Sequence, residues 1–320
     1  MSGKRIVLID LMQGLAMVLV VLGHHLFPFL PAWYKSMHYY IYLFHMPFFI
    51  FISAFLIRYS FKGIDSIKDY WQYIRRKAVK FIPPYIIIGL LCILLKRPES
   101  INAFLTQAAC LLNDPLGSEA TFLWYIYLLF LLYIISPVVF ALPAYGKFFL
   151  LAICIPLSLY PINTDLFCLA YLCKLSPFYM AGILMAESWK KTQWQIPHPH
   201  LWGVSSLIVF IGLSVLHFYI GYNLPLEHII PWIAIPSLSY VAWMLGKSIL
   251  IRNSLVFISI NCFGIYLLHM FFVQALALAA ARTPFVGTTS GAIIYLALSV
   301  PISIICASFC WKWIWSLRSK

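Results

Sequence analysis

The sequence predicts an all-α, polytopic transmembrane helix bundle of about ten spans, with both termini on the cytoplasmic side. Of its 320 residues, 63% are hydrophobic and 10% are charged, and the mean hydropathy is +0.92. A soluble protein of this length does not need so large an apolar fraction, so the composition excludes an ordinary soluble domain. The polar stretches between the apolar runs are too short for a core of their own, so we expect a single integral membrane domain over residues 1–320.

Apolar runs long enough to cross a bilayer define the predicted helices. They lie near residues 6–25, 38–58, 79–95, 121–143, 148–163, 166–186, 201–220, 228–246, 254–279 and 288–311. The first run lacks a small-residue cleavage site and contains Asp10, so we expect it to be retained as a span and not removed as a signal peptide.

Basic residues orient the predicted bundle, because cytoplasmic loops carry the excess of Lys and Arg. With the N-terminus inside, 17 Lys and Arg fall in cytoplasmic segments, Lys147 among them, and four fall outside. This asymmetry predicts an even number of spans and two cytoplasmic termini. It also accounts for the net charge of +13, so membrane lipids are expected around the chain and no nucleic acid is expected as a partner.

The first span carries polar residues on one face. His24 follows Gln13 by eleven residues, which leaves about 20° of rotation between them and about 16 Å along the axis. Asp10 lies about 40° off the same face. Because ionisable groups inside a span usually face a bundle interior or a wet cavity, this face is predicted to line a site.

Three histidines on three predicted spans lie at a similar depth. By helix rise, His24, His45 and His269 all fall in the outer third of a hydrocarbon core about 30 Å thick. They converge on one site, or each is satisfied separately by backbone or hydroxyl partners, and the sequence leaves both possibilities open. Tyr266 lies three residues before His269, so the two side chains are neighbours on one helix face.

A basic cluster, Arg75, Arg76 and Lys77, precedes the third apolar run. It sets orientation and attracts anionic lipids, or it binds phosphate, because the guanidinium of Arg matches phosphate oxygens bidentately. Charge alone favours the first interpretation.

Trp124 and Lys174 are two further candidates. Trp124 opens the fourth span, where an interfacial aromatic residue needs no functional explanation. Lys174 lies within the sixth span, which is unusual, but its partner cannot be identified from the sequence. The eight cysteines show no spacing typical of a zinc site, and no metal ion is expected.

Six short motifs follow one another along almost the whole chain. They are Asp10…Gly14-Leu15-Ala16…Gly23-His24, Phe44-His45-Met46-Pro47…Ser53, Arg75…Pro83-Pro84-Tyr85, Leu123-Trp124-Tyr125, Phe178-Tyr179…Gly182 and Tyr266-Leu267-Leu268-His269. In their order and spacing the chain resembles the acyltransferase-3 family of integral membrane O-acyltransferases. The most similar part of that family is the sugar O-acetylase branch, which includes fucose O-acetylases.

The resemblance implies a ten-span core, a cytoplasmic acyl-CoA donor such as acetyl-CoA, and an acceptor hydroxyl on a cell-surface or lipid-linked glycan. We also expect no tightly bound cofactor and a place in a bacterial inner membrane, with which the lack of an N-x-S/T sequon is compatible, and the sequence does not predict the oligomeric state. Two positions depart from the family pattern. Gln13 stands where the family usually has a basic residue, and Ala54 stands where a glycine is common.

The roles that we expect follow from acyl transfer, which needs a base for the hydroxyl proton and donors for the developing oxyanion. His24 is the expected base, with Asp10 and Gln13 on its helix, and an acyl-histidine intermediate stays open. The CoA phosphates are expected at Arg75, Arg76 and Lys77. The acceptor is expected to contact His45, Trp124, Lys174, Tyr266 and His269.

Two alternatives belong to other function classes. One is a multi-pass transporter or exporter of a glycan or small molecule, against which the lack of a visible internal repeat counts mildly. The other is an inactive relative that acts as an assembly partner, which the neutral side chain of Gln13 suggests.

Overall fold

The computed structural model describes residues 6–160, 162–193, 197–221, 223–283 and 287–318, which form twelve α-helices and no β-strand. The helices are α1 (Val7–Gly23), α2 (Ala32–Ser60), α3 (Ile67–Leu95), α4 (Ile101–Asn113), α5 (Trp124–Ala141), α6 (Ala144–Leu159), α7 (Leu169–Thr192), α8 (Pro199–Ile220), α9 (Leu224–Leu245), α10 (Ile249–Ile260), α11 (Cys262–Ala280) and α12 (Thr289–Arg318). Short 3-10 helices, Thr121–Leu123 and Leu166–Cys168, precede α5 and α7. The predicted all-α class is confirmed.

Eight helical segments in the described part of the chain are long and apolar enough to cross a membrane. The predicted runs 6–25 and 148–163 form α1 and α6, which are apolar but have only 17 and 16 residues. A multi-pass helical membrane protein is therefore confirmed, whereas the count of ten spans and the orientation stay predictions. Lys4, Arg5 and Lys320, which entered the charge asymmetry, lie outside the described residues.

Several helix boundaries differ from the sequence prediction: α2 begins at Ala32 and α3 at Ile67, and two further differences change the number of helices. The predicted span 254–279 is divided between α10 and α11 at Asn261, whose side chain donates a 2.8 Å hydrogen bond to the carbonyl of Phe257. Asparagine often competes with helical backbone bonding in this way. The segment between α3 and α5, expected as a loop, contains α4, and the Ser100 hydroxyl caps that helix by accepting from the N–H of Ala103.

The chain folds into two compact units. The first contains residues 1–52 and 194–320, and the second contains residues 53–193. Helix α2 contributes its first part to one unit and its last part to the other.

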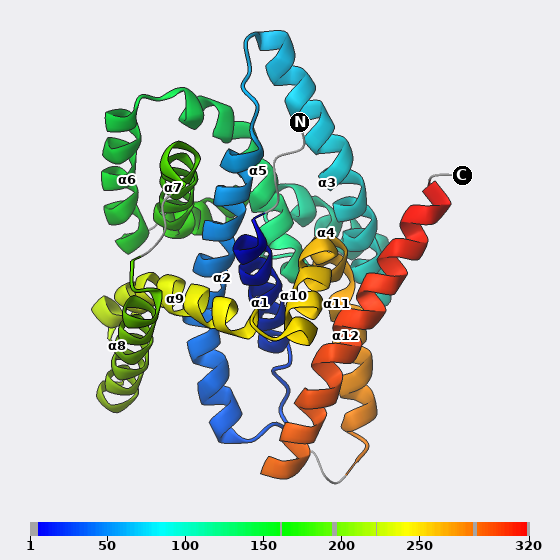
Figure 1. The fold of residues 1–320 in the computed structure, drawn as a ribbon. Helices are drawn as coiled ribbons and strands as arrows, with labels where there is room; N and C mark the ends of the chain where they lie inside the picture. The colour runs from blue at the N-terminus through cyan, green and yellow to red at the C-terminus, as the bar shows by residue number, and fades with distance from the viewer. Residues whose placement is uncertain (1–5, 161, 194–196, 222, 284–286, 319–320) are drawn as a thin grey trace. The chain divides into compact units, whose positions relative to one another are not determined.

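In the first unit α1 is the central helix. It contacts α9, α10, α11 and α12, and Figure 1 shows α1 and α10 side by side. The closest approach is at Gly14, where an added Cβ would lie 2.3 Å from the carbonyl oxygen of Leu255 on α10. Only glycine allows the two backbones to come this near. The small residue in the first motif is therefore a packing requirement.

In the second unit α3 packs against α4 and α5, and α6 packs against α7. Two phenol groups donate hydrogen bonds to carbonyls at the carboxyl end of α4. The hydroxyl of Tyr85 donates to the carbonyl of Leu111 at 2.7 Å, and that of Tyr127 donates to the carbonyl of Leu112 at 2.8 Å. These carbonyls belong to the last turn of α4, where intrahelical donors run out.

Gly14→Ala is expected to destabilise the protein by about 1–3 kcal/mol, because the new methyl group would force α1 away from the α10 backbone. Thermal unfolding of the purified protein in detergent measures the change. Gly212→Ala is the matched control. That glycine also lies inside a helix, but nothing lies within 4 Å of an added Cβ, so the change should stabilise by at most about 1 kcal/mol. Equal effects at both positions would contradict the close α1–α10 contact.

Candidate active site

His24 lies where α1 ends. Its backbone N–H still bonds to the carbonyls of Val20 and Val21, both at 3.2 Å, so the residue continues the last turn of the helix before the chain leaves it. The preceding Gly23 packs closely against Tyr42, whose ring would lie 3.1 Å from an added Cβ. Taken as a whole residue, His24 is half-buried.

His24 and His269 are in ring contact. Their centroids are 5.0 Å apart, with the ring planes tilted by 48°. His269 is fully buried, and its Nδ1 lies 2.8 Å from the carbonyl oxygen of Tyr266 and 3.1 Å from that of Ile265. Because a carbonyl only accepts, Nδ1 carries the proton and the neutral ring presents Nε2 as an acceptor. The structure therefore brings two of the three predicted histidines together, with Tyr266 beside them.

His45 is held in a similar way. Its exposed fraction is 4%, and Nδ1 lies 2.7 Å from the carbonyl oxygen of Ile41, one turn earlier on α2. The ring contacts Tyr42 at a centroid distance of 4.7 Å. His45, His269, His25 and His38 all lie near His24. The two possibilities left by the sequence thus combine, because the rings gather in one region while the backbone fixes the Nδ1 atoms of His45 and His269.

Asp10 and Gln13 take a different partner. The hydroxyl of Ser259 on α10 lies 3.2 Å from Oδ1 of Asp10 and 2.8 Å from Oε1 of Gln13. This cluster is about 16 Å from His24 along α1, so the structure does not bring Asp10 and Gln13 to the imidazole. Ser259 was missed in the sequence, where a lone serine in an apolar run gives no signal of its partner.

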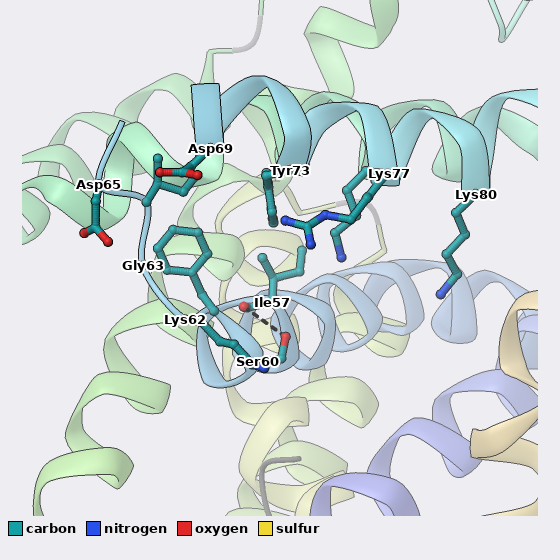
Figure 2. Close-up of a pocket in the computed structure, with 12 residues that line it drawn as sticks. Ile57, Ser60, Lys62, Gly63, Asp65, Asp69, Tyr73, Lys77 and Lys80 are labelled. Atoms are coloured by element: carbon teal, nitrogen blue, oxygen red, sulfur yellow. Dashed lines mark hydrogen bonds between the residues drawn. The ribbon is translucent and has the colours of Figure 1, made fainter. Parts of the chain in front are cut away.

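The basic cluster borders a cavity in the second unit. The cavity has a volume of about 540 Å³ and is lined by side chains from the end of α2, the following loop and the first half of α3. Figure 2 shows Tyr73, Lys77 and Lys80 projecting from α3 towards it, with Ser60 and Lys62 opposite. Arg76 and Lys77 of the predicted trio line the cavity, and Lys77 lies 4.0 Å from the centroid of the Tyr133 ring. Arg75 is exposed and is not among the lining residues.

The charges around this cavity are mixed but favour anions. Four basic side chains, Lys62, Arg76, Lys77 and Lys80, face two carboxylates, Asp65 and Asp69. The Ser66 hydroxyl donates to Asp69 at 2.7 Å, which fixes one of these carboxylates at the start of α3. The remaining excess of positive charge suits a ligand with several negative charges.

Trp124 and Lys174 also lie in the second unit. The Trp124 ring packs against Tyr171 at a centroid distance of 4.6 Å, which joins the start of α5 to the first turn of α7. Lys174 is exposed in the second turn of α7. Among the described residues, no group of three or more His, Cys, Asp or Glu side chains is arranged to hold a metal ion.

An ion triad that the sequence did not reveal joins three helices of the second unit. Oε1 of Glu187 on α7 lies 2.6 Å from both Nε of Arg58 on α2 and Nζ of Lys147 on α6. Because Lys147 is only 5% exposed, it is not simply a surface charge of the kind that orients a bundle. Removing one partner of a shielded ion cluster leaves charge uncompensated.

Glu187→Gln is expected to lower the free energy of unfolding by about 3–5 kcal/mol, because two shielded cations would lose their counter-ion. Glu119→Gln is the control. Its ion pair with Lys96 is 3.8 Å long and exposed, so its loss should cost about 1 kcal/mol or less. Unfolding of the purified variants in denaturant gives both values, and equal losses would argue against the triad.

Comparison with known proteins identifies the family. A family model described as an acyltransferase domain, Acyl_transf_3, matches residues 6–308. No curated protein and no solved structure matches the chain. The matched range includes every predicted site residue and almost all of both units. With its spanning helices, the chain therefore belongs to the acyltransferase-3 family and is a multi-pass membrane acyltransferase.

Proposed function

We propose that the protein transfers an acyl group, preferentially acetyl, from cytoplasmic acyl-CoA to a hydroxyl of a cell-surface or lipid-linked glycan in a bacterial inner membrane. The observation that carries the proposal is the contact between His24 and His269 at the end of α1. An imidazole can both remove and return a proton. A second imidazole with a fixed tautomer can orient the first, as the third group of a catalytic triad does.

The reaction needs one proton acceptor and no change of oxidation state. His24 takes the proton of the glycan hydroxyl as its oxygen attacks the thioester carbon. The tetrahedral intermediate then collapses, the carbon–sulfur bond breaks, and the proton on His24 passes to the CoA thiolate. The products are the acyl ester and free CoA.

His269 is best suited to orient His24. Its Nδ1–H is committed to backbone carbonyls, so the neutral ring has an acceptor and no further donor. It can accept from an N–H of His24, which leaves the other nitrogen of His24 directed to the hydroxyl. The same argument applies to His45, whose Nδ1–H is held by Ile41. As neutral rings these two side chains serve as hydroxyl acceptors rather than as oxyanion donors.

The cavity beside α3 is the proposed site for the nucleotide end of acyl-CoA. Its volume lies within the usual range for ligand pockets. Arg76 can bind a phosphate through two parallel N–H bonds, and Lys77 and Lys80 add point charges. We therefore propose Arg76 and Lys77 from the expected trio as phosphate ligands, and Lys80 in place of Arg75.

His24→Ala is expected to reduce acyl transfer by about 10²- to 10⁴-fold, which is the usual contribution of a general base. Transfer of labelled acetyl from acetyl-CoA to lipid-linked sugars in proteoliposomes is the measurement, with CoA binding as the check on folding. The variant should still insert and still bind CoA. Near wild-type turnover by His24→Ala would exclude it as the base.

His25→Ala serves as the neighbouring comparison. His25 is fully buried, and its Nδ1 lies 2.8 Å from the carbonyl oxygen of Val21, so its loss should reduce stability. Turnover per folded molecule should change much less than in His24→Ala. If His25→Ala instead loses more turnover than His24→Ala, the proposal has assigned the role of base to the wrong histidine.

The double variant Arg76→Ala/Lys77→Ala should raise the KM for acyl-CoA by about tenfold or more, because hydrogen bonds to charged groups each contribute about 1.5–3 kcal/mol. Arg75→Ala should leave that KM nearly unchanged, since Arg75 is exposed and does not line the cavity. The KM should also rise with salt. If Arg75→Ala has the larger effect, the donor phosphates bind elsewhere.

A further inference from the structure

A second polar cluster lies in the first unit, outside the residues that the proposed reaction uses. It joins the first turns of α2 to the end of α8 and the start of α9. Its centre is His217, whose exposed fraction is 3%. Tyr39 and Tyr40 from α2 and Glu227 from α9 surround this imidazole.

The hydrogen bonds of the cluster have a defined direction. The carboxylate of Glu227 accepts from the hydroxyl of Tyr39 at 2.5 Å and from Nε2 of His217 at 3.4 Å. On the other side of the ring, Nδ1 of His217 lies 3.2 Å from the hydroxyl of Tyr40. The Tyr39 ring also stacks on His217, with centroids 5.8 Å apart. The cluster is therefore a pre-organised set of rings with their polar edges fixed.

Tyr39, Tyr40 and His217 form one wall of a groove of about 490 Å³. The groove is lined by rings, by hydroxyl groups and by one ammonium group, from Tyr39, Tyr40, His217, Phe218, Ser36 and Lys35. Tyr39 is 40% exposed and Phe218 is 61% exposed, so two ring surfaces are accessible to a ligand. Aromatic side chains with fixed polar groups are the usual lining of a small-ligand site.

A purely structural role would be to join α8 to α9, and the chain contains a comparison for it. At the opposite end of the same helix pair, Nδ1 of His200 lies 3.1 Å from the hydroxyl of Tyr240. His200 also contacts the Trp243 ring at a centroid distance of 5.0 Å, and Nζ of Lys247 lies 4.4 Å from the centroid of that ring. The His217 end differs in having a carboxylate within the cluster and a groove beside it, which helix joining does not require.

We propose that this groove is an acceptor subsite that binds a sugar unit of the glycan away from the reacting hydroxyl. A sugar presents an apolar C–H face, which suits an exposed aromatic ring, and a rim of hydroxyls, which suits fixed donors and acceptors. The groove also offers the ammonium group of Lys35 and the hydroxyl of Ser36 to such a rim. The inference rests on the proposed function for the identity of the ligand.

The position of the groove on α2 supports this role. Tyr40 precedes His45 by five residues, which is about 7.5 Å along the helix axis and about 140° around it. The groove is thus near the histidine region but faces another side of α2. Binding energy from such a remote part of a substrate can hold the reacting hydroxyl in place.

The test uses an array of defined, fluorescently labelled oligosaccharides as the probe and the protein in nanodiscs. Wild-type protein should bind at least one of them. Tyr39→Ala and His217→Gln should weaken that binding by about tenfold, the loss expected when a few directed contacts are removed. In acyl transfer to the same oligosaccharide, the KM for the acceptor should rise while kcat stays within a few fold.

Two further variants separate recognition from folding. His200→Gln removes the matching contact at the other end of α8 and α9, and it should bind oligosaccharides as wild type does. Tyr39→Phe keeps the ring and loses the bond to Glu227, so it should show an intermediate loss. Thermal unfolding of all four variants reports whether each remains folded.

The outcomes distinguish the two proposals. If no oligosaccharide binds, or if His217→Gln and His200→Gln weaken binding equally, the subsite is wrong, whatever the acyl-transfer activity. If the groove variants alone lose oligosaccharide binding but no acyl transfer from acyl-CoA occurs, the subsite stands and the proposed function fails.

Discussion

The hydroxyl of Ser259, shared between Asp10 and Gln13, fixes one end of α1, and the contact between His24 and His269 lies at its other end. From Gln13 to His24 is eleven residues along α1, and from Ser259 to His269 is ten residues along α10 and α11. By helix rise the first distance is about 16 Å, whereas the second segment crosses the break at Asn261. Helix α1 is thus joined to α10 by a hydroxyl contact at one end and to α11 by ring contact at the other. The backbone contact at Gly14 holds α1 close to α10.

These two contacts give a physical reason for the polar face of the first helix. The sequence predicted that Asp10, Gln13 and His24 share a face, and periodicity was sufficient for that prediction. Periodicity did not reveal that the two ends of the face contact different residues, because a pairing across about 250 residues leaves no local pattern. The neutral Gln13, where the related family commonly has a basic residue, accepts from Ser259 through its amide oxygen. Arginine and lysine have no acceptor atom with which to make that bond.

Other differences between the sequence-based predictions and the structure have the same origin, which is that they depend on contacts between separate helices. Lys147 counted as one of many cytoplasmic charges, yet it is buried against Glu187, because burial depends on which helices meet. Arg75 and Arg76 are adjacent in sequence but differ by about 100° around α3, so only Arg76 lines the cavity. The predicted ninth span is divided at Asn261, and the break comes between the residue that bonds to Gln13 and the residue that contacts His24. Apolar composition predicted the helices well, whereas polar residues within them were understood only from their contacts.

The choice among the histidines as the base follows from burial and hydrogen bonding together. A base must carry a positive charge while the tetrahedral intermediate exists. In His269 and His45 the Nδ1–H is already committed to the backbone, and the exposed fractions are 0% and 4%, so adding a proton at Nε2 would create a buried cation. Burying a charge without a counter-ion is costly. His24 lies at the end of α1 with its ring against that of His269, whose Nε2 is available as an acceptor for the imidazolium. The two rings held by the backbone are therefore suited to positioning, and His24 is the ring proposed for proton transfer.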